Sequence, residues 1–108
     1  MTYQVVLTAA AKQDLRNAYL WAAERAPQTA ARWLQRFEAE LGTLADDPER
    51  FQVAPENAFV EAEIRQLIFG RRQSAYRALY TIVGKDVQVL HIRRAVRDWA
   101  TPDDLKVE

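Results

Sequence analysis

The chain contains no cysteine and a single histidine, His91. Without cysteine there is no disulfide framework and no thiolate ligand, and one histidine excludes a histidine-rich metal site. We therefore expect neither a metal nor another cofactor. The sequence also lacks an apolar run near the roughly 20 residues of a membrane span. Residues 1–7 lack the basic start and long apolar core of a secretory signal. These absences favour a cytoplasmic protein with no membrane partner.

The composition is that of an ordinary soluble protein. The 108 residues, 49% hydrophobic and 28% charged, are enough for one domain with a modest core, so we expect a single domain over residues 1–108. The formal net charge is zero, which by itself argues against a nucleic-acid partner.

The charges are nevertheless segregated along the chain. Between Ile64 and Arg97 only one residue, Asp86, is acidic, whereas eight are cationic: Arg65, Arg71, Arg72, Arg77, Lys85, Arg93, Arg94 and Arg97. These residues lie in strand-like sequence. An ordered basic sheet surface usually binds an anionic partner.

Two helical patterns follow a short first strand, Thr2–Leu7. Thr8 suits the N-cap of a helix that starts at Ala9, and Pro27 suits the first position of a second helix. Apolar residues recur at spacings of three and four in both: Ala11, Leu15, Ala18, Tyr19 and Ala22, then Ala30, Trp33, Leu34, Phe37, Leu41 and Leu44. The second pattern ends at Asp46-Asp47-Pro48. We expect an antiparallel helical hairpin that covers a sheet.

After an irregular stretch from Glu49 to Ala62, expected to be a loop over the sheet edge, the period changes to two. Strands are predicted over Glu63–Phe69, Ser74–Val83 and Asp86–Arg93, joined by short glycine-containing turns. In the tail, Trp99 and Leu105 are suited to docking and Pro102 limits helix. The predicted class is α+β: an N-terminal strand, the helical hairpin and a C-terminal antiparallel three-stranded meander in one small sheet.

The register of the last hairpin has two solutions. A two-residue loop pairs Val83 with Asp86 and places Arg77 opposite Ile92, whereas a three-residue loop places Arg77 opposite Arg93. Like charges directly opposite are unfavourable, so the second register requires a bound anion or a carboxylate nearby. A one-residue slip reverses the face of every side chain, and the sequence leaves both registers open.

An ordered set of segments resembles the RelE/ParE superfamily of toxins from bacterial type II toxin–antitoxin modules. The segments are Tyr3-Gln4-Val5-Val6-Leu7-Thr8, Ala30-Ala31-Arg32-Trp33, Leu44-Ala45-Asp46-Asp47-Pro48-Glu49-Arg50, Glu63-Ile64-Arg65-Gln66-Leu67-Ile68-Phe69-Gly70-Arg71, Tyr76-Arg77-Ala78-Leu79-Tyr80-Thr81-Ile82 and Val87-Gln88-Val89-Leu90-His91-Ile92-Arg93-Arg94. The resemblance covers nearly the whole chain, and its family fold agrees with the α+β class predicted above.

The resemblance implies a growth-inhibiting toxin that a small antitoxin from the adjacent gene neutralises. It leaves two targets: RelE-like members cleave mRNA on the ribosome, and ParE-like members poison DNA gyrase. The RelE-like pattern retains Arg77 and Arg97 here, but its lysine positions hold Ile68 and Gly70 and its tyrosine position holds Asp103. Because the usual proton-transfer groups are absent, the resemblance favours the ParE-like branch.

The candidate residues for binding the target or an acidic antitoxin segment are Arg65, Arg77, Arg93, Arg94, Arg97 and Trp99. For the endoribonuclease alternative the candidates are Arg77, His91 and Arg97. The competing interpretation of the arginines is internal ion pairing to Glu61, Glu63 or Asp98. His91 is more typical of a packed strand residue than of a catalyst, because the sequence offers it no evident orienting partner. A degenerate member that binds only its antitoxin is a third possibility.

Overall fold

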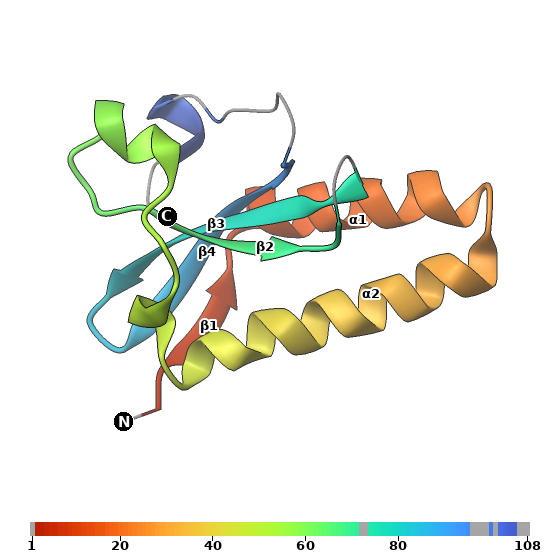
Figure 1. Cartoon of the computed structure of the whole chain (residues 1–108), viewed down its shortest axis with the longest axis horizontal. Coiled ribbons are helices and arrows are strands. Elements are labelled where there is room, and N and C mark those ends of the chain that lie inside the picture. Colours follow the sequence, from red (N-terminus) through yellow and green to blue (C-terminus); the bar gives the residue numbers. More distant parts are fainter. Residues whose placement is uncertain (1, 72–73, 96–99, 101, 106–108) are drawn as a thin grey trace.

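The computed structural model describes residues 2–71, 74–95, 100 and 102–105. Its main elements are β1 (Gln4–Leu7), α1 (Ala9–Ala23), α2 (Pro27–Gly42), β2 (Arg65–Phe69), β3 (Tyr76–Val83) and β4 (Asp86–Arg94). Short 3-10 turns follow α2 and precede the C-terminus: η1 (Thr43–Ala45), η2 (Pro48–Arg50), η3 (Pro55–Phe59) and η5 (Pro102–Leu105). The α+β class and the order of the elements are confirmed (Figure 1).

The helix boundaries follow from the residues that flank them. The Thr8 hydroxyl accepts a hydrogen bond from the Ala11 backbone N–H (3.2 Å), and Pro27 is the first residue of α2. The two helices form the predicted hairpin, whose connection projects beyond the end of the sheet (Figure 1). A further 3-10 turn begins at Pro102, where the sequence had suggested only a limit to helix.

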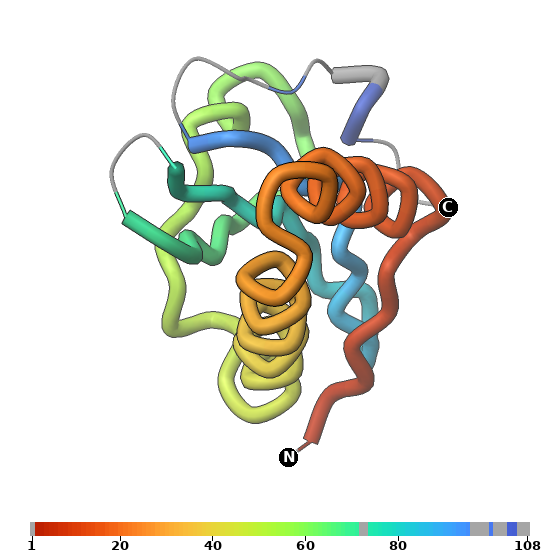
Figure 2. The backbone as a smooth tube through the Cα atoms, turned by 90° about the vertical axis from the view of Figure 1, so that its right-hand side faces the viewer, coloured from red at the N-terminus to blue at the C-terminus, as the bar shows by residue number. Residues whose placement is uncertain are grey.

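The four strands form one sheet in the order β1-β4-β3-β2. β1 runs parallel to β4, and the other two pairs are antiparallel. Both helices cover the same face of the sheet and bury the main core, which includes Leu15, Phe37, Leu41, Ala78 and Val89 (Figure 2).

The other face of the sheet carries a second, smaller core. It buries Ala54, Ile64, Leu79, Leu90, Ala100 and Leu105. Leu79 lies between Ala78 and Tyr80 of the main core, as expected for alternating faces of a strand. The segment expected as a plain loop, residues 49–62, therefore supplies part of this second cover together with the C-terminal residues. The predicted docking of Leu105 is confirmed.

A β-bulge combines the two registers that the sequence had left as alternatives. Val83 pairs with Asp86 at the turn, as a two-residue loop requires, yet Arg77 pairs with Arg93 at the other end of the hairpin. The register shifts between Leu79 and Tyr80, where β4 accommodates an additional residue. A single register throughout the hairpin is therefore wrong.

Candidate functional site

Arg77 and Glu56 form a buried ion pair beneath the second core. Their side chains are 4% and 0% exposed, and two guanidinium nitrogens of Arg77 donate to the two carboxylate oxygens of Glu56. Arg77 also donates to the amide oxygen of Gln66 at 3.1 Å. Glu56 comes from η3, so the expected loop provides the carboxylate that the paired arginines need. The sequence had suggested Glu61, Glu63 or Asp98 as internal partners of the arginines: Glu63 is confirmed as a partner of Arg65, whereas Arg77 pairs with Glu56 instead.

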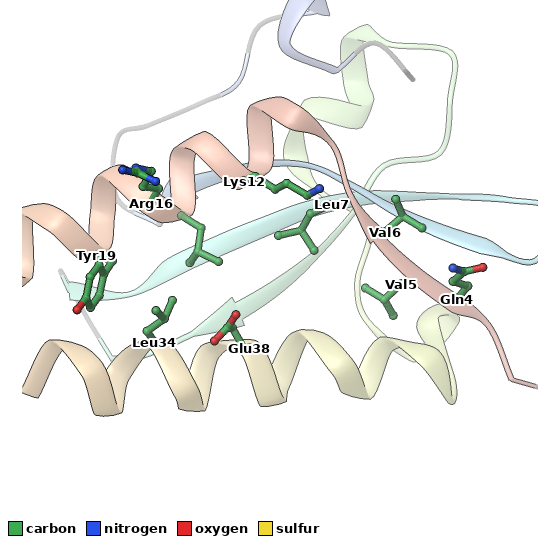
Figure 3. A pocket seen from close by; sticks show the side chains of 10 residues that line it. Gln4, Val5, Val6, Leu7, Lys12, Arg16, Tyr19, Leu34 and Glu38 are labelled. Atoms are coloured by element: carbon green, nitrogen blue, oxygen red, sulfur yellow. The ribbon is translucent and has the colours of Figure 1, made fainter.

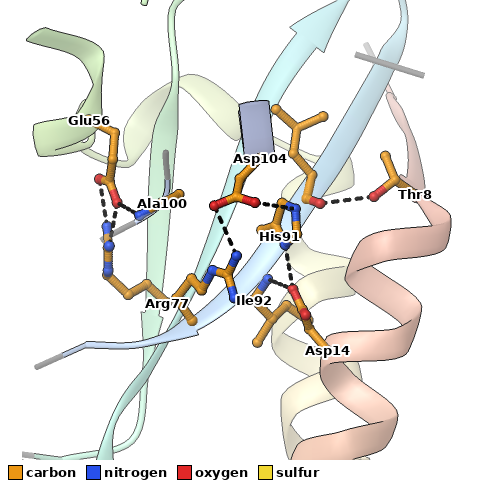
Figure 4. Close-up of polar contacts among 10 residues, drawn as sticks. Thr8, Asp14, Glu56, Arg77, His91, Ile92, Ala100 and Asp104 are labelled. Carbon is orange, nitrogen blue, oxygen red and sulfur yellow. Dashed lines mark hydrogen bonds and ion pairs between the residues drawn. The ribbon is translucent and has the colours of Figure 1, made fainter. Parts of the chain in front are cut away.

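The same carboxylate holds the C-terminal segment. The backbone N–H of Ala100 donates to Glu56 Oε2 at 2.9 Å (Figure 4). Burial by itself raises the pKa of Glu56, but the hydrogen bonds from Arg77 and the Ala100 backbone outweigh it and lower the pKa below the usual value. Glu56 is therefore a charged group that joins η3, β3 and the C-terminal segment.

Arg93 and His91 share a second carboxylate, Asp104 of η5. Arg93 Nη2 lies 3.0 Å from Asp104 Oδ2, and His91 Nε2 lies 3.7 Å from Asp104 Oδ1. The other ring nitrogen of His91 lies 2.7 Å from Asp14 Oδ2 of α1, which also accepts the Ile92 backbone N–H at 3.0 Å (Figure 4). The sequence-based statement that His91 lacks an orienting partner is wrong, because Asp14 is distant in sequence and adjacent in the fold.

Arg65 also has internal partners. Its guanidinium lies 2.6 Å from Glu63 Oε1 and donates to the backbone carbonyls of Glu49 (3.1 Å) and Phe51 (2.6 Å). Its side chain thereby fastens the segment before η3 to the start of β2. Three arginines of the basic run, at positions 65, 77 and 93, are thus engaged with groups of the chain itself.

The remaining candidates fall into two groups. Arg94 and Arg71 are exposed at one end of the sheet, and Lys85 is exposed in the turn at the other end. Arg97, Trp99 and Arg72 lie outside the described residues, and so does the side chain of Asp103. The described residues of the basic run are therefore not gathered into one cationic face.

The two described positions that hold lysines in the RelE-like pattern have different surroundings. Ile68 is 49% exposed on β2. Gly70 has a φ of +100°, and a Cβ there would lie 3.1 Å from the Ala75 Cα. A lysine at position 70 would be strained in this turn. The glycine is a structural requirement of the backbone, not a neutral replacement.

Another hollow lies between the helices and β1. This cavity of about 620 Å³ is lined by side chains of β1, α1 and α2, among them Val6, Lys12, Arg16, Tyr19 and Glu38 (Figure 3). It contains charges of both signs and no histidine.

Among the described residues, no group of three or more His, Asp or Glu side chains is placed to hold a metal ion. Within the part of the chain that the structure describes, no helix is long and apolar enough to cross a membrane.

Comparisons with known proteins converge on one family. Residues 5–99 match the family model described as ParE toxin of type II toxin-antitoxin system, parDE. Toxin RelE1 of Caulobacter vibrioides is 33% identical over 92 residues, which make up 85% of this chain and 92% of that protein.

Two solved structures are similar in fold. The chromosomal ParDE TA system from P. aeruginosa contains a chain with a TM-score of 0.69 and 22% identity, over 86% of this chain and 96% of that one. A mutant of E. coli toxin RelE in the free state has a TM-score of 0.59 and 15% identity, over 89% of this chain and 86% of that one. At these identities the likeness concerns the fold.

Proposed function

Because this chain belongs to the ParE toxin family of type II toxin–antitoxin systems, we propose that it arrests growth by binding DNA gyrase in the cytoplasm. Its first partner is the cognate antitoxin that such a system implies. The comparisons name relatives of both branches, ParE and RelE, so the choice of target depends on the residues of this chain.

The observation that carries the proposal is the burial of Arg77. Metal-independent cleavage of RNA needs a base for the 2′-hydroxyl, cations for the charge of the transition state and an acid for the leaving oxygen. Arg77 is one of two arginines that match the RelE-like pattern, and it is 4% exposed in a pair with Glu56. A phosphate would have to break that pair to reach the guanidinium, which costs several kcal/mol, on the order of 3–5.

The proton-transfer groups of the RelE-like pattern are also replaced. Ile68 and Gly70 stand where that pattern has lysines, and neither side chain transfers a proton. A protein without proton-transfer groups at these two positions is better suited to binding a target than to cleaving RNA. The residues proposed to contact gyrase are Arg94, which is exposed at the end of β4, together with Arg97 and Trp99.

A supercoiling assay with purified gyrase and relaxed plasmid tests the proposal. We expect the toxin to inhibit supercoiling at near-stoichiometric amounts and the antitoxin to restore it. Arg94→Glu should weaken inhibition about tenfold or more, whereas Lys85→Glu, the same reversal of charge at the opposite end of the sheet, should not. Full supercoiling at stoichiometric toxin would exclude gyrase as the target.

One observation favours the second candidate, a ribosome-dependent endoribonuclease that uses Arg77, His91 and Arg97. Asp14 holds the His91 ring at 2.7 Å, as an orienting carboxylate does in acid–base catalysis. Primer extension on translated mRNA after induction separates the two functions. Codon-positioned cleavage that disappears in Arg97→Ala and His91→Asn would establish the nuclease and overturn the gyrase proposal. If induction causes no growth arrest, the chain is a member that only binds its antitoxin.

A further inference from the structure

His91 lies between two carboxylates that come from opposite ends of the chain. Its Nδ1 lies 2.7 Å from Asp14 Oδ2 of α1, and its Nε2 lies 3.7 Å from Asp104 Oδ1 of η5 (Figure 4). Ionised carboxylates accept hydrogen bonds and donate none. A neutral ring that donates to Asp14 would turn a lone pair toward Asp104, whereas a protonated ring presents an N–H to each. The surroundings of His91 therefore match the imidazolium ion.

The charged groups that face this ring favour the same form. Asp14 and Asp104 carry two negative charges, and Arg93, whose Nη2 lies 3.0 Å from Asp104 Oδ2, carries one positive charge. On the neighbouring strand β3, the guanidinium of Arg77 is neutralised by Glu56 of η3. These groups together carry one net negative charge, which stabilises a cation placed between them.

Other cations of the elements packed against the ring line separate cavities. Lys12 and Arg16 of α1 line the cavity beside β1 (Figure 3), and Arg94 of β4 lines a cavity beside Trp21. Among the described residues, the charge balance at the ring is therefore set by the two carboxylates and the Arg93 guanidinium.

Asp104 belongs to the C-terminal segment, of which residues 100 and 102–105 are described. In that part of the segment Ala100 and Leu105 are buried in the second core. The Ala100 N–H donates to a carboxylate of η3 at 2.9 Å, and Asp104 contacts two side chains of β4. The segment is thus attached by polar links as well as by one large apolar side chain. Segments with few buried apolar contacts open locally at low free energy, so each polar link affects the closed population.

We propose that His91 is a pH-dependent latch that holds the C-terminal segment on the sheet. The closed segment supplies the second carboxylate of the imidazolium, so the closed form holds the ring proton more tightly than the open form. Closure is therefore strongest in mild acid and weakens as the pH rises through the range in which histidine loses its proton, about 5 to 8. Opening also separates Asp104 from Arg93, so the latch decides whether that guanidinium is paired within the chain. This inference goes beyond the proposed function and is the same for either target.

Hydrogen exchange measured by nuclear magnetic resonance tests the latch in the purified toxin between about pH 5.5 and 8. Because His91 is the single histidine of the chain, its ring nitrogen signals need no further assignment. The protection factor of the Ala100 amide should fall about three- to tenfold over the same interval in which the ring loses its proton. The Thr8 amide, which donates to the Val89 carbonyl at 3.0 Å, is the internal control and should keep its protection.

Two variants separate the latch from a merely structural role of the histidine. His91→Gln removes the titrating ring and keeps a side chain that can donate to a carboxylate, so the protection of the Ala100 amide should no longer depend on pH. Asp104→Asn removes the carboxylate that the closed segment presents and should have the same effect. Asp86→Asn, the same substitution at the other end of β4, is the matched control and should retain the pH dependence of the wild type.

Constant protection of the Ala100 amide in the wild type while the His91 ring titrates would overturn the proposal, and this result requires no variant to fold. An equal fall of protection in the wild type and in folded His91→Gln would overturn it too, because another group would then cause the fall. Circular dichroism and thermal melts identify the folded variants.

Discussion

Arg77 and Glu56, 21 residues apart, meet in an ion pair that is closed to solvent on both sides. The pair explains why two arginines can lie opposite each other in the β3–β4 hairpin: Glu56 neutralises Arg77, and Asp104 neutralises Arg93. The carboxylates come from segments outside the hairpin. The two opposed arginines, which looked like a site for an external anion, are thus neutralised by carboxylates of the same chain.

Removal of one member of this pair should destabilise the fold strongly. Glu56→Gln or Arg77→Met leaves a buried charge without its partner, so each should lower the free energy of unfolding by about 3–5 kcal/mol. The double variant Arg77→Met/Glu56→Gln should lose much less than the sum of the two. Urea unfolding followed by circular dichroism measures all three. Additive losses would mean that the two side chains do not stabilise each other.

The lowered pKa of Glu56 predicts acid sensitivity. Because the unfolded chain takes up this proton at a higher pH than the folded chain, the stabilisation is complete above the ordinary pKa of about 4.5 and is lost as the pH falls through the folded-state pKa. Urea midpoints measured from pH 6 downwards, at intervals of about half a unit, should therefore fall more steeply for the wild type than for Glu56→Gln. Parallel curves of urea midpoint against pH for the two proteins would contradict a lowered pKa of Glu56 in the folded state.

Gly70 should be intolerant of any side chain. With a φ of +100° and only 3.1 Å to the Ala75 Cα for a new Cβ, Gly70→Ala should cost about 1–3 kcal/mol. Gly42 is the matched control: it ends α2, and a Cβ there would meet nothing within 4 Å, so Gly42→Ala should be neutral or stabilise by up to about 1 kcal/mol. Thermal denaturation compares the two. Equal melting temperatures would show that the β2–β3 turn adapts to a side chain.

Asp14 should matter for stability even though it lies on a surface helix. Its carboxylate accepts from the Ile92 N–H and contacts His91, so it fastens α1 to β4 beyond the end of β1. Asp14→Ala should cost about 1–3 kcal/mol, because it leaves a partly buried backbone donor without its acceptor. Gln13→Ala, at the preceding residue of the same helix, should change the free energy of unfolding by less than about 0.5 kcal/mol. Chemical denaturation of the pair of variants decides between these values.

Local sequence patterns determined the element order, the helical hairpin and the α+β class. Each depends on periodicity, an N-cap at Thr8 or prolines at the helix ends, all of which act within a few residues. Three of the predicted strands began two residues too early, whereas the fourth began at the observed residue, Asp86, and ended one residue too early. Strand ends depend on pairing partners, which the local sequence does not contain. The sequence did not predict the second core, because residues 49–62 have no periodic pattern that would indicate packing on the sheet.

The roles of the candidate residues depended on the tertiary structure. The sequence by itself showed that Arg65, Arg77 and Arg93 are concentrated in one stretch of the chain, and the family pattern drew attention to Arg77. Only the fold placed Glu56 against Arg77, Asp104 against Arg93 and Asp14 against His91, which are 21, 11 and 77 residues apart in the sequence. Ion pairs form between neighbours in space, and the packing of strands and helices, not their order in the chain, decides which charges are neighbours.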